Sequence, residues 1–252
     1  MQSLIARRTL LKMSLAAMAL PVSLRRAPAA GGAVAVVELF TSQGCSRCPP
    51  ADALLAELAE REDIVALAYH VDYWNYVGWK DELATPENTE RQKAYAKAFE
   101  AAVYTPQMVV NGRYNVVGSD RAALFAALQQ ARHARALPVP VGLSYTDQSI
   151  VVDIGKGGTE AADAHVLVVY YHPGQLAKIG GGENKGKEID YRNIVTGYQT
   201  VGMWHGAPLR LELPKSDIEG KGGRCAALVQ AMDGRGRPGR ILGAARMADH
   251  VY

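Results

Sequence analysis

The first half of the chain alternates between continuous apolar runs and segments with helical periodicity. The largely apolar, β-branched segments 34–40 and 64–71 are typical of strands that are covered on both faces of a sheet. Apolar residues recur at helical spacing in three segments, which predict helices: the one that begins at Pro49-Pro50, 87–102 and 121–136. Proline suits the first turn of a helix, because the backbone N–H groups there have no helical partner.

A hairpin is predicted between the second and third of these helices. Asn111-Gly112 separates the apolar runs 107–110 and 114–117. Both turn residues tolerate the positive φ angles of a tight type I′ turn. The predicted order of elements in the first half is therefore βαβαββα.

The second half has a β-rich pattern. The prolines of 137–140 (LPVP) interrupt the last helix, so we place a boundary between the domains 30–137 and 138–252. Beyond it, turn residues separate six alternating or β-branched runs: 141–145, 149–154, 165–171, 194–201, 209–213 and 225–232. This pattern predicts an antiparallel, sandwich-like C-terminal domain. The Gly- and Lys-rich segment 178–190 is interpreted as a long hairpin loop.

The N-terminal segment 1–29 has the layout of an export signal. Arg7-Arg8 precede an apolar stretch, 13–20, that is too short to span a bilayer core of about 30 Å. Small residues follow, with Ala-Pro-Ala at 27–29 as a candidate cleavage site. The paired arginines predict export by the twin-arginine route, to the periplasm or otherwise out of the cytoplasm, where conditions are oxidising. An N-terminal membrane anchor is the alternative.

Removal of this segment changes the charge of the protein. The whole chain has 28 basic and 25 acidic residues, and segment 1–29 contains five of the basic residues and none of the acidic ones. The remaining chain then has 23 basic and 25 acidic residues, a formal charge of −2. Such a balance does not favour nucleic acid or an anionic membrane surface as a partner. No second transmembrane stretch follows, so we expect no membrane insertion after signal removal.

Two of the three cysteines form a Cys-x-x-Cys motif where the first predicted strand meets its helix. A helix N-terminus stabilises a thiolate through its macrodipole and its unpaired N–H groups. The position therefore predicts Cys45 as the attacking thiol and Cys48, one turn into the helix, as the resolving thiol. Arg47 between them adds positive charge and is a candidate for contact with substrate. The same pair could instead be half of a metal site or a structural staple.

A metal site would need ligands beyond the two cysteines. A tetrahedral site has about four ligands, and no second Cys-x-x-Cys motif supplies them. His70, at the end of the second predicted strand, could complete a copper site with Cys45 and Cys48. It could also shuttle protons, or simply form a hydrogen bond at the end of its strand.

Several motifs carry a resemblance to a known family. They are the segments 40–52 (FTSQGCSRCPPAD), 70–74 (HVDYW), 78–81 (GWKD) and 104–112 (YTPQMVVNG), with 182–184 (GEN) and 191–193 (YRN) in the second half. The order of elements, with Cys-x-x-Cys before the first helix and Thr-Pro before the hairpin, resembles the thioredoxin fold. The motifs resemble the exported, thioredoxin-like bacterial family catalogued as domain of unknown function 1223. This family brings no established function with it.

The resemblance to thioredoxin-like proteins implies roles for three residues. Pro106 is expected to have a cis peptide bond and to face the cysteine pair, which leaves the backbone of Thr105 free to pair with an extended substrate. Glu38 matches the buried acid of thioredoxins and is a candidate base for Cys48. Alternatively, Glu38 pairs with a Lys or Arg. Asp52, four residues after Cys48, competes for the role of base, although an acidic residue in a first turn also stabilises the helix by itself.

Aromatic residues gather in the segment 73–79 (YWNYVGW). Trp74 and its neighbours could wall a substrate groove, because exposed aromatic side chains anchor partners. They could equally form a core beneath an insertion. The third cysteine, Cys225, lies alone in a predicted strand and is interpreted as an apolar filler.

These patterns lead to three functional hypotheses. The first is a periplasmic thiol:disulfide oxidoreductase that acts on exported proteins bearing thiols or disulfides, without a cofactor. The second is a copper-binding or copper-delivery module that uses the same cysteines. The third is a non-catalytic protein that binds partners. The direction of electron flow does not follow from the sequence, because a few contacts around the sulfurs set the reduction potential.

Overall fold

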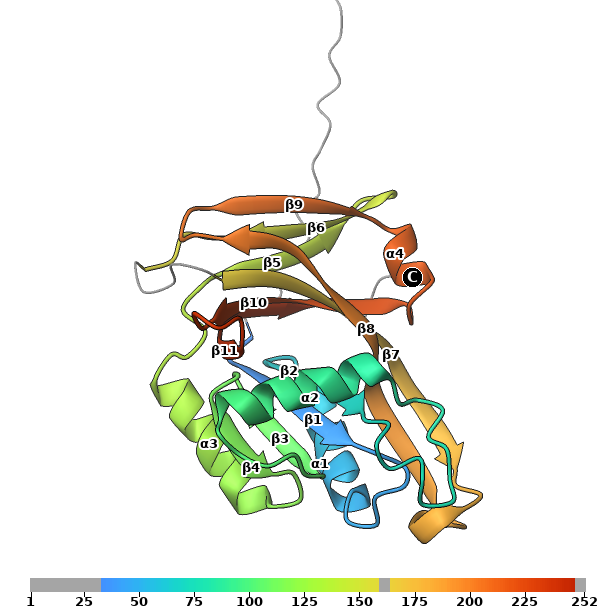
Figure 1. Cartoon of the computed structure of the whole chain (residues 1–252). Helices are drawn as coiled ribbons and strands as arrows, with labels where there is room; N and C mark the ends of the chain where they lie inside the picture. Colours follow the sequence, from blue (N-terminus) through green and yellow to red (C-terminus); the bar gives the residue numbers. More distant parts are fainter. Residues whose placement is uncertain (1–32, 159–163, 248–252) are drawn as a thin grey trace, which may run out of the picture.

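The fold of the chain is described from a computed structural model, over residues 33–158 and 164–247 (Figure 1). The predicted export signal at 1–29 lies outside the described residues. Among the described helices, none has the length and apolarity needed to cross a membrane.

The order predicted for the first half is confirmed. Its elements are β1 (Ala35–Thr41), α1 (Pro49–Ala59), β2 (Ile64–His70), α2 (Pro86–Ala98), β3 (Gln107–Val110), β4 (Tyr114–Val117) and α3 (Arg121–His133). The strands lie in the order β2-β1-β3-β4; β1 and β2 are parallel, whereas β3 is antiparallel to β1 and to β4. Helices α1 and α3 pack on one face of this sheet and α2 on the other.

Within its described residues, 138–158 and 164–247, the second half is β-rich and has two short helical turns. Its elements are β5 (Val141–Tyr145), β6 (Ser149–Ile154), β7 (Ala164–Lys178), the 3-10 turn η1 (Gly182–Asn184), β8 (Glu188–Trp204), β9 (Leu209–Pro214), α4 (Ser216–Glu219), β10 (Arg224–Met232) and β11 (Pro238–Arg246). β5, β6 and β9 form a separate antiparallel sheet. This sheet packs on one end of β7, β8 and β10 through an apolar core that includes Val152, Val168 and Trp204.

The other strands of the second half do not form a sheet of their own. They extend the sheet of the first half, giving eight strands in the order β11-β10-β7-β8-β2-β1-β3-β4. The antiparallel, sandwich-like C-terminal domain predicted from the sequence is therefore found only in part: the protein is a mixed α/β structure with one large mixed sheet and one small antiparallel sheet. The strands on both sides of the boundary predicted after residue 137 share the large sheet.

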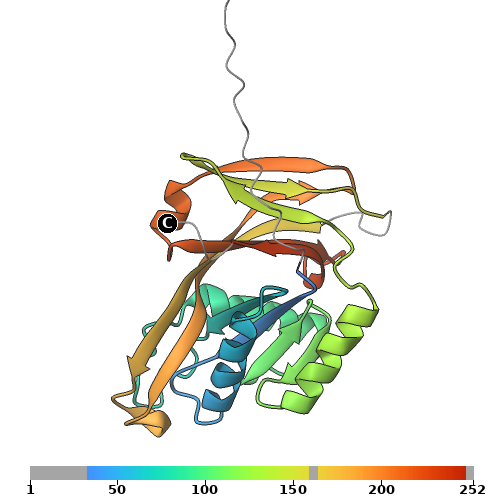
Figure 2. The ribbon, with the colours of Figure 1, turned by 180° about the vertical axis from the view of Figure 1, so that it is seen from behind.

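The long β7–β8 hairpin makes this junction. Figures 1 and 2 show both strands running from the upper sheet down beside β2 and α1. Only Ala68 and Ile194 pair in register between β2 and β8, so side chains supplement the ladder. Asn193, with φ 46°, donates from Nδ2 to the Ala66 carbonyl at 2.9 Å. Asn88 of α2 donates from Nδ2 both to the His70 carbonyl of β2, at 3.1 Å, and to the Val195 carbonyl of β8, at 3.4 Å. The hairpin is thereby held against the edge of the first-half sheet.

The tight turn predicted between β3 and β4 is confirmed. Asn111 and Gly112 have φ angles of 51° and 62°, as a type I′ turn requires. The Asn111 side chain also accepts a hydrogen bond from the Val36 backbone at 2.6 Å. A Cβ at Gly112 would lie 2.2 Å from the Gly239 carbonyl oxygen, so glycine is needed there for space as well as for its backbone angle.

A buried ion pair ties the two halves together. Glu38 on β1 is 0% exposed and pairs with Arg91 of α2 at 2.7 Å; the Tyr95 hydroxyl donates to its other oxygen at 2.5 Å. Gln230 of β10 accepts from Arg91 at 3.1 Å and donates to Tyr95 at 2.7 Å. The Arg91 guanidinium also lies over the Tyr69 ring, 5.5 Å from its centroid. The alternative role considered for Glu38, an ion pair with a basic residue, is thus the one the structure shows.

Substitution Glu38→Gln should destabilise the protein. The change keeps the size of the side chain but leaves Arg91 as a buried cation without its carboxylate, which costs about 3 kcal/mol. Urea denaturation of the wild type and the variant measures this loss. The matched control is Glu57→Gln, because Glu57 forms an exposed pair with Arg121 and should change stability little. Equal stability of the Glu38→Gln variant and the wild type would contradict the expectation.

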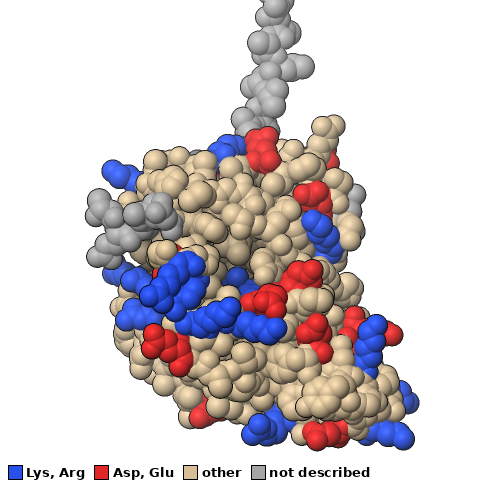
Figure 3. Space-filling model, in the orientation of Figure 1, with Lys and Arg blue, Asp and Glu red and all other residues tan. Residues whose placement is uncertain are grey.

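Charges are mixed on the visible surface. On the face shown in Figure 3, Lys and Arg side chains form a band across the middle, and acidic side chains lie beside this band and below it. Neither sign covers the whole face, so this face offers no broad field of one sign to steer a strongly charged partner.

Candidate functional site

The two motif cysteines lie at the start of α1 and form a disulfide. Cys48 is the N-cap of the helix, and its N–H donates to the Cys45 carbonyl at 3.1 Å. Ser46 and Arg47 between them are exposed, whereas Cys45 is 1% and Cys48 0% exposed. Arg47 is thus available for contact with a partner, but the sulfurs lie beneath the surface.

The first turn of α1 offers fewer free N–H groups than the sequence argument assumed. Pro49 and Pro50 have no N–H, and the Ala51 and Asp52 N–H groups both bond to the Cys48 carbonyl, at 2.8 and 3.1 Å. Stabilisation of a Cys45 thiolate here would therefore rest on the helix macrodipole and on nearby positive charge, rather than on a set of open amides.

Pro106 lies beside the start of α1. The Thr105–Pro106 peptide bond is cis, as expected. Gly118 packs between Pro106 and α1, because a Cβ placed on it would lie 3.1 Å from Pro106 Cβ and 3.2 Å from Ala51 Cβ. Pro106 therefore packs close to the helical turn that follows the cysteines.

Trp74 bridges the cysteine loop and Thr105. Its Nε1 donates to the Thr105 hydroxyl at 2.8 Å, and a Cβ on Gly44 would meet Trp74 Cβ at 3.1 Å. Thr105 is only 4% exposed, and none of the hydrogen bonds found among the described residues involves its backbone. The aromatic segment around Trp74 divides in two: Trp79 donates to the Gln43 side chain at 2.7 Å, whereas Tyr76 is 82% exposed.

The tip of the β7–β8 hairpin holds the cysteine loop. Asn184 is buried and its Nδ2 donates to the carbonyls of Gln43 and Cys45, at 2.9 and 2.8 Å. The Gly- and Lys-rich sequence around Asn184 predicts a loop and indicates no contact with the cysteines. Its only signal was that 182–184 carries part of the family resemblance.

Substitution Asn184→Ala should loosen this loop. Two buried carbonyls would lose their donor, which costs about 2 kcal/mol of unfolding free energy. Urea denaturation measures the loss, and hydrogen exchange should show faster exchange of the amides around Cys45. Glu183→Ala, at an exposed neighbouring position, is the control and should leave both unchanged. Unaltered hydrogen exchange around Cys45 in the Asn184→Ala variant would contradict the role of Asn184 in holding the cysteine loop.

Asp52 is the acid that the structure places behind the cysteines. It follows Cys48 by one helical turn, is buried, and accepts a hydrogen bond from the Thr41 hydroxyl at 2.7 Å. Burial raises the pKa of Asp52 to about 7, against smaller opposing effects of His70 and Thr41. Glu38 cannot share this position, because alternate side chains of a strand point to opposite faces: Thr41 points to α1, whereas Glu38 points to α2.

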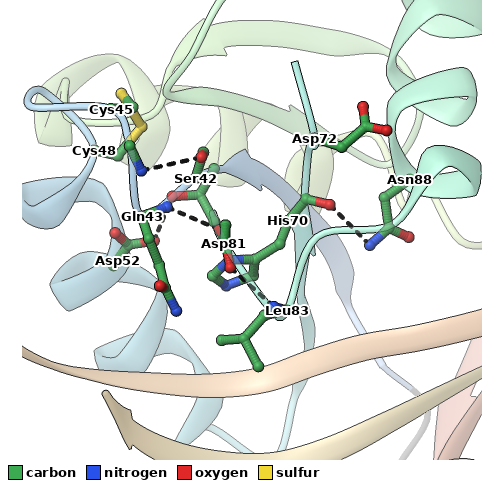
Figure 4. Close-up of polar contacts among 12 residues, drawn as sticks. Ser42, Gln43, Cys45, Cys48, Asp52, His70, Asp72, Asp81, Leu83 and Asn88 are labelled. Atoms are coloured by element: carbon green, nitrogen blue, oxygen red, sulfur yellow. Dashed lines mark hydrogen bonds and ion pairs between the residues drawn. A yellow bond between two sulfur atoms is a disulfide. The ribbon is translucent and has the colours of Figure 1, made fainter. Parts of the chain in front are cut away.

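His70 is paired with Asp81 near Asp52 (Figure 4). The Asp81 carboxylate makes three contacts. Its Oδ2 lies 2.7 Å from His70 Nδ1 and accepts the Gln43 N–H at 2.8 Å, and its Oδ1 accepts the Leu83 N–H at 2.9 Å. Burial acts to raise the pKa of Asp81, but the charge and hydrogen bond of His70 and the two N–H groups outweigh it and lower the pKa. Asp81 therefore joins His70 to the cysteine loop through Gln43.

The copper alternative gains no support from these positions. Within residues 33–158 and 164–247, no group of three or more His, Cys, Asp or Glu side chains is arranged to hold a metal ion. His70 Nδ1 is engaged by Asp81. Cys225 lies apart in β10, buried, and burial raises the pKa of its thiol to about 12, which fits an inert filler.

Comparison with known proteins places the chain in a family. A family described as "Protein of unknown function (DUF1223)" matches residues 36–230. The chain belongs to this family. The crystal structure of protein AGR_C_4864 from Agrobacterium tumefaciens is similar to this DUF1223 protein, with 39% identity and a TM-score of 0.78 over 88% of this chain and 97% of that one.

A more distant structure shares only the fold. HBP35 of Porphyromonas gingivalis has 13% identity and a TM-score of 0.56, over 86% of this DUF1223 protein and 75% of that chain. No curated protein matches the sequence significantly. The family match spans both halves, which agrees with a site that combines the cysteine loop of one half with Asn184 of the other.

Proposed function

We propose that this protein is a thioredoxin-like thiol:disulfide oxidoreductase, with Cys45 as nucleophile and Cys48 as resolving thiol. The order βαβαββα, a Cys-x-x-Cys disulfide before α1 and Pro106 packed beside that helix support a thioredoxin-like arrangement. The observation that carries the proposal is Asp52. A buried carboxylate whose pKa is near neutral, one turn from the resolving cysteine, suits a group that takes up and returns a proton.

The exchange proceeds in two balanced steps. The Cys45 thiolate attacks one sulfur of a substrate disulfide; a Cys45–substrate disulfide forms and one substrate thiolate leaves. Cys48 then transfers its proton to Asp52 and attacks Cys45 Sγ, which forms the Cys45–Cys48 disulfide and releases the second substrate thiolate. The protein loses two electrons and the substrate gains them. The same steps in reverse oxidise a dithiol substrate.

The remaining site residues would hold the substrate. Arg47 is exposed beside the sulfurs, and the Thr105 backbone lies next to Pro106, where an extended chain could pair with it. Since Thr105 and Cys45 are almost fully buried, pairing would require the side chain of Trp74 to move from Thr105. Exported proteins with thiols or disulfides are the proposed partners. The signal-like segment 1–29 supports a periplasmic or otherwise exported location, and a disulfide is compatible with an oxidising compartment.

The reduction potential of the Cys45–Cys48 couple tests the proposal. Equilibration of the purified protein with glutathione or dithiothreitol buffers, followed by alkylation and mass measurement, gives the value. A couple that exchanges with substrates should lie above about −300 mV, whereas structural disulfides typically lie below that value. A potential below it would assign the pair to a structural staple.

A further inference from the structure

Three buried polar atoms near the disulfide have no hydrogen-bond partner among the described residues. They are Asp52 Oδ2, His70 Nε2 and the Tyr191 hydroxyl. Asp52 is 3%, His70 0% and Tyr191 1% exposed, so bulk water does not satisfy them. Such orphaned groups are rare in proteins, because burial of a polar atom without a partner is costly.

The three side chains come from different elements and lie on the same side of the sheet. Thr41 of β1 and His70 of β2 are register partners, and the Thr41 hydroxyl bonds to Asp52 of α1. Tyr191 of β8 packs edge-on against His70, with ring centroids 4.6 Å apart. Helix α1 also packs directly on β8. The three side chains thus belong to one cluster between α1, β2 and β8, which we call the Asp52 cluster.

The chemistry of the Asp52 cluster is complementary. Asp52 Oδ2 accepts hydrogen bonds when ionised. Burial, with the charges of Asp52 and Asp81, raises the pKa of Tyr191, so its hydroxyl keeps its proton and remains a donor. When His70 is neutral, a proton on Nδ1 is held by the Asp81 carboxylate, and Nε2 is then an acceptor. One internal water, which makes two to four hydrogen bonds, matches this set of one donor and two acceptors.

We propose that these three atoms bind one internal water, and that through it His70, held by Asp81, is a positioning residue for proton transfer at Asp52. The binding of the water does not depend on the proposed function, whereas the proton transfer rests on it. The proton that Cys48 gives to Asp52 passes through the water to His70 Nε2, which leaves Asp52 ionised and an imidazolium beside the Asp81 carboxylate. When the disulfide is reduced again, the proton returns to Cys48 by the same route.

The groups that act on Asp52 are few. His70 from β2 and Asp81 from the segment after β2 act on it through their charges, and Thr41 of β1 acts through its hydrogen bond. Tyr191 faces it from β8, and Cys48 is the N-cap of its helix. His70 acts to lower the pKa of Asp52, and the Tyr191 hydroxyl is a donor that would reach it through the water. Removal of the His70 imidazole, or of the Tyr191 hydroxyl, should therefore disfavour the ionised carboxylate. Both changes shift the pH at which Asp52 loses its proton upward.

The pH profile of the resolving step tests the proton-transfer part. Cys45 is loaded with a small aromatic thiol as a mixed disulfide, and the release of that thiol by Cys48 is followed between pH 5 and pH 9, a range of about two units either side of neutrality. In the wild type, the rate should rise with a midpoint near the pKa of Asp52. The midpoint should move up by about half a pH unit or more in His70→Gln and Tyr191→Phe. The exposed His133→Gln is the matched control and should keep the wild-type midpoint.

The outcomes separate this inference from the proposed function. Midpoints in both variants equal to that of the wild type would overturn the role of His70. Tyr191→Phe keeps the buried ring, so it remains informative if His70→Gln fails to fold. Absence of any thiol release by the wild type would overturn the proposed function and the proton route with it. The water is judged independently by a high-resolution crystal structure of the oxidised protein: density within hydrogen-bonding distance of all three atoms supports it, and its absence overturns it.

Discussion

Substitution Cys45→Ser is expected to abolish thiol exchange, lowering its rate by at least about a thousandfold. A serine hydroxyl stays protonated at neutral pH and cannot form a disulfide, so the first step of the proposed exchange is lost. Cys48→Ala should behave differently. It keeps the attacking thiol but removes the group that releases the partner, so it should accumulate covalent Cys45–substrate disulfides.

Gel electrophoresis without reductant, followed by mass spectrometry of the linked peptides, measures this trapping. Cys225→Ala is the control, because the Cys225 thiol is buried in β10 and takes no part in the exchange. The proposed order of attack would be contradicted if Cys45→Ser trapped partners as well as Cys48→Ala does. Equal exchange rates in the wild type and Cys45→Ser would contradict the mechanism altogether.

Substitution Asp52→Asn is expected to make the protein more stable above pH 7 and slower in exchange. The folded-state pKa of Asp52 is raised from 3.8 to about 7, so the folded protein holds this proton more tightly than the unfolded chain. Stability therefore falls as pH rises from about 4 to about 7, and the full penalty, about 4 kcal/mol, applies above that range. Asparagine carries no charge and still accepts the Thr41 hydrogen bond, so the penalty disappears while the proton acceptor for Cys48 is lost.

Urea denaturation at pH 4 and pH 8 measures the stability difference between variant and wild type at each pH. The variant should gain stability at pH 8 relative to pH 4, and release of a Cys45-bound thiol should slow by about a hundredfold at pH 7. Asp153→Asn is the matched control, because Asp153 lies in an exposed pair with Arg210. An Asp52→Asn protein that is less stable at pH 8 and exchanges at the wild-type rate would show that Asp52 serves only the packing of α1.

The local sequence pattern does not decide which of two acids, Glu38 or Asp52, lies near Cys48. The sequence marked both as acids near the cysteines. A strand projects alternate residues to opposite faces, and α1 covers only one face of β1. Glu38 points to the face of β1 that α2 covers. Its carboxylate therefore binds Arg91 and Tyr95 and is not available to Cys48.

The contacts of Asn184 and Tyr191 could not be predicted from the sequence, because their partners lie far away along the chain. Asn184 is 139 positions along the chain from Cys45, whose carbonyl it binds. Tyr191 of β8 is likewise distant in sequence from His70 of β2, against whose ring it packs. Local hydrophobic periodicity carries no information about such distant contacts. The family resemblance of 182–184 and 191–193 marked both segments, without indicating what they touch.

The sequence by itself determined the local elements: the strand, cysteine loop and helix around Cys45, and the Asn111-Gly112 turn. These follow from backbone preferences and short-range spacing, which act over a few residues. Only the tertiary structure decided that both halves share one sheet, that Asn184 holds the cysteine loop, and that Asp52 rather than Glu38 lies behind Cys48. Those outcomes depend on which faces are brought together by long-range strand pairing, and burial then fixes which charged groups must find partners.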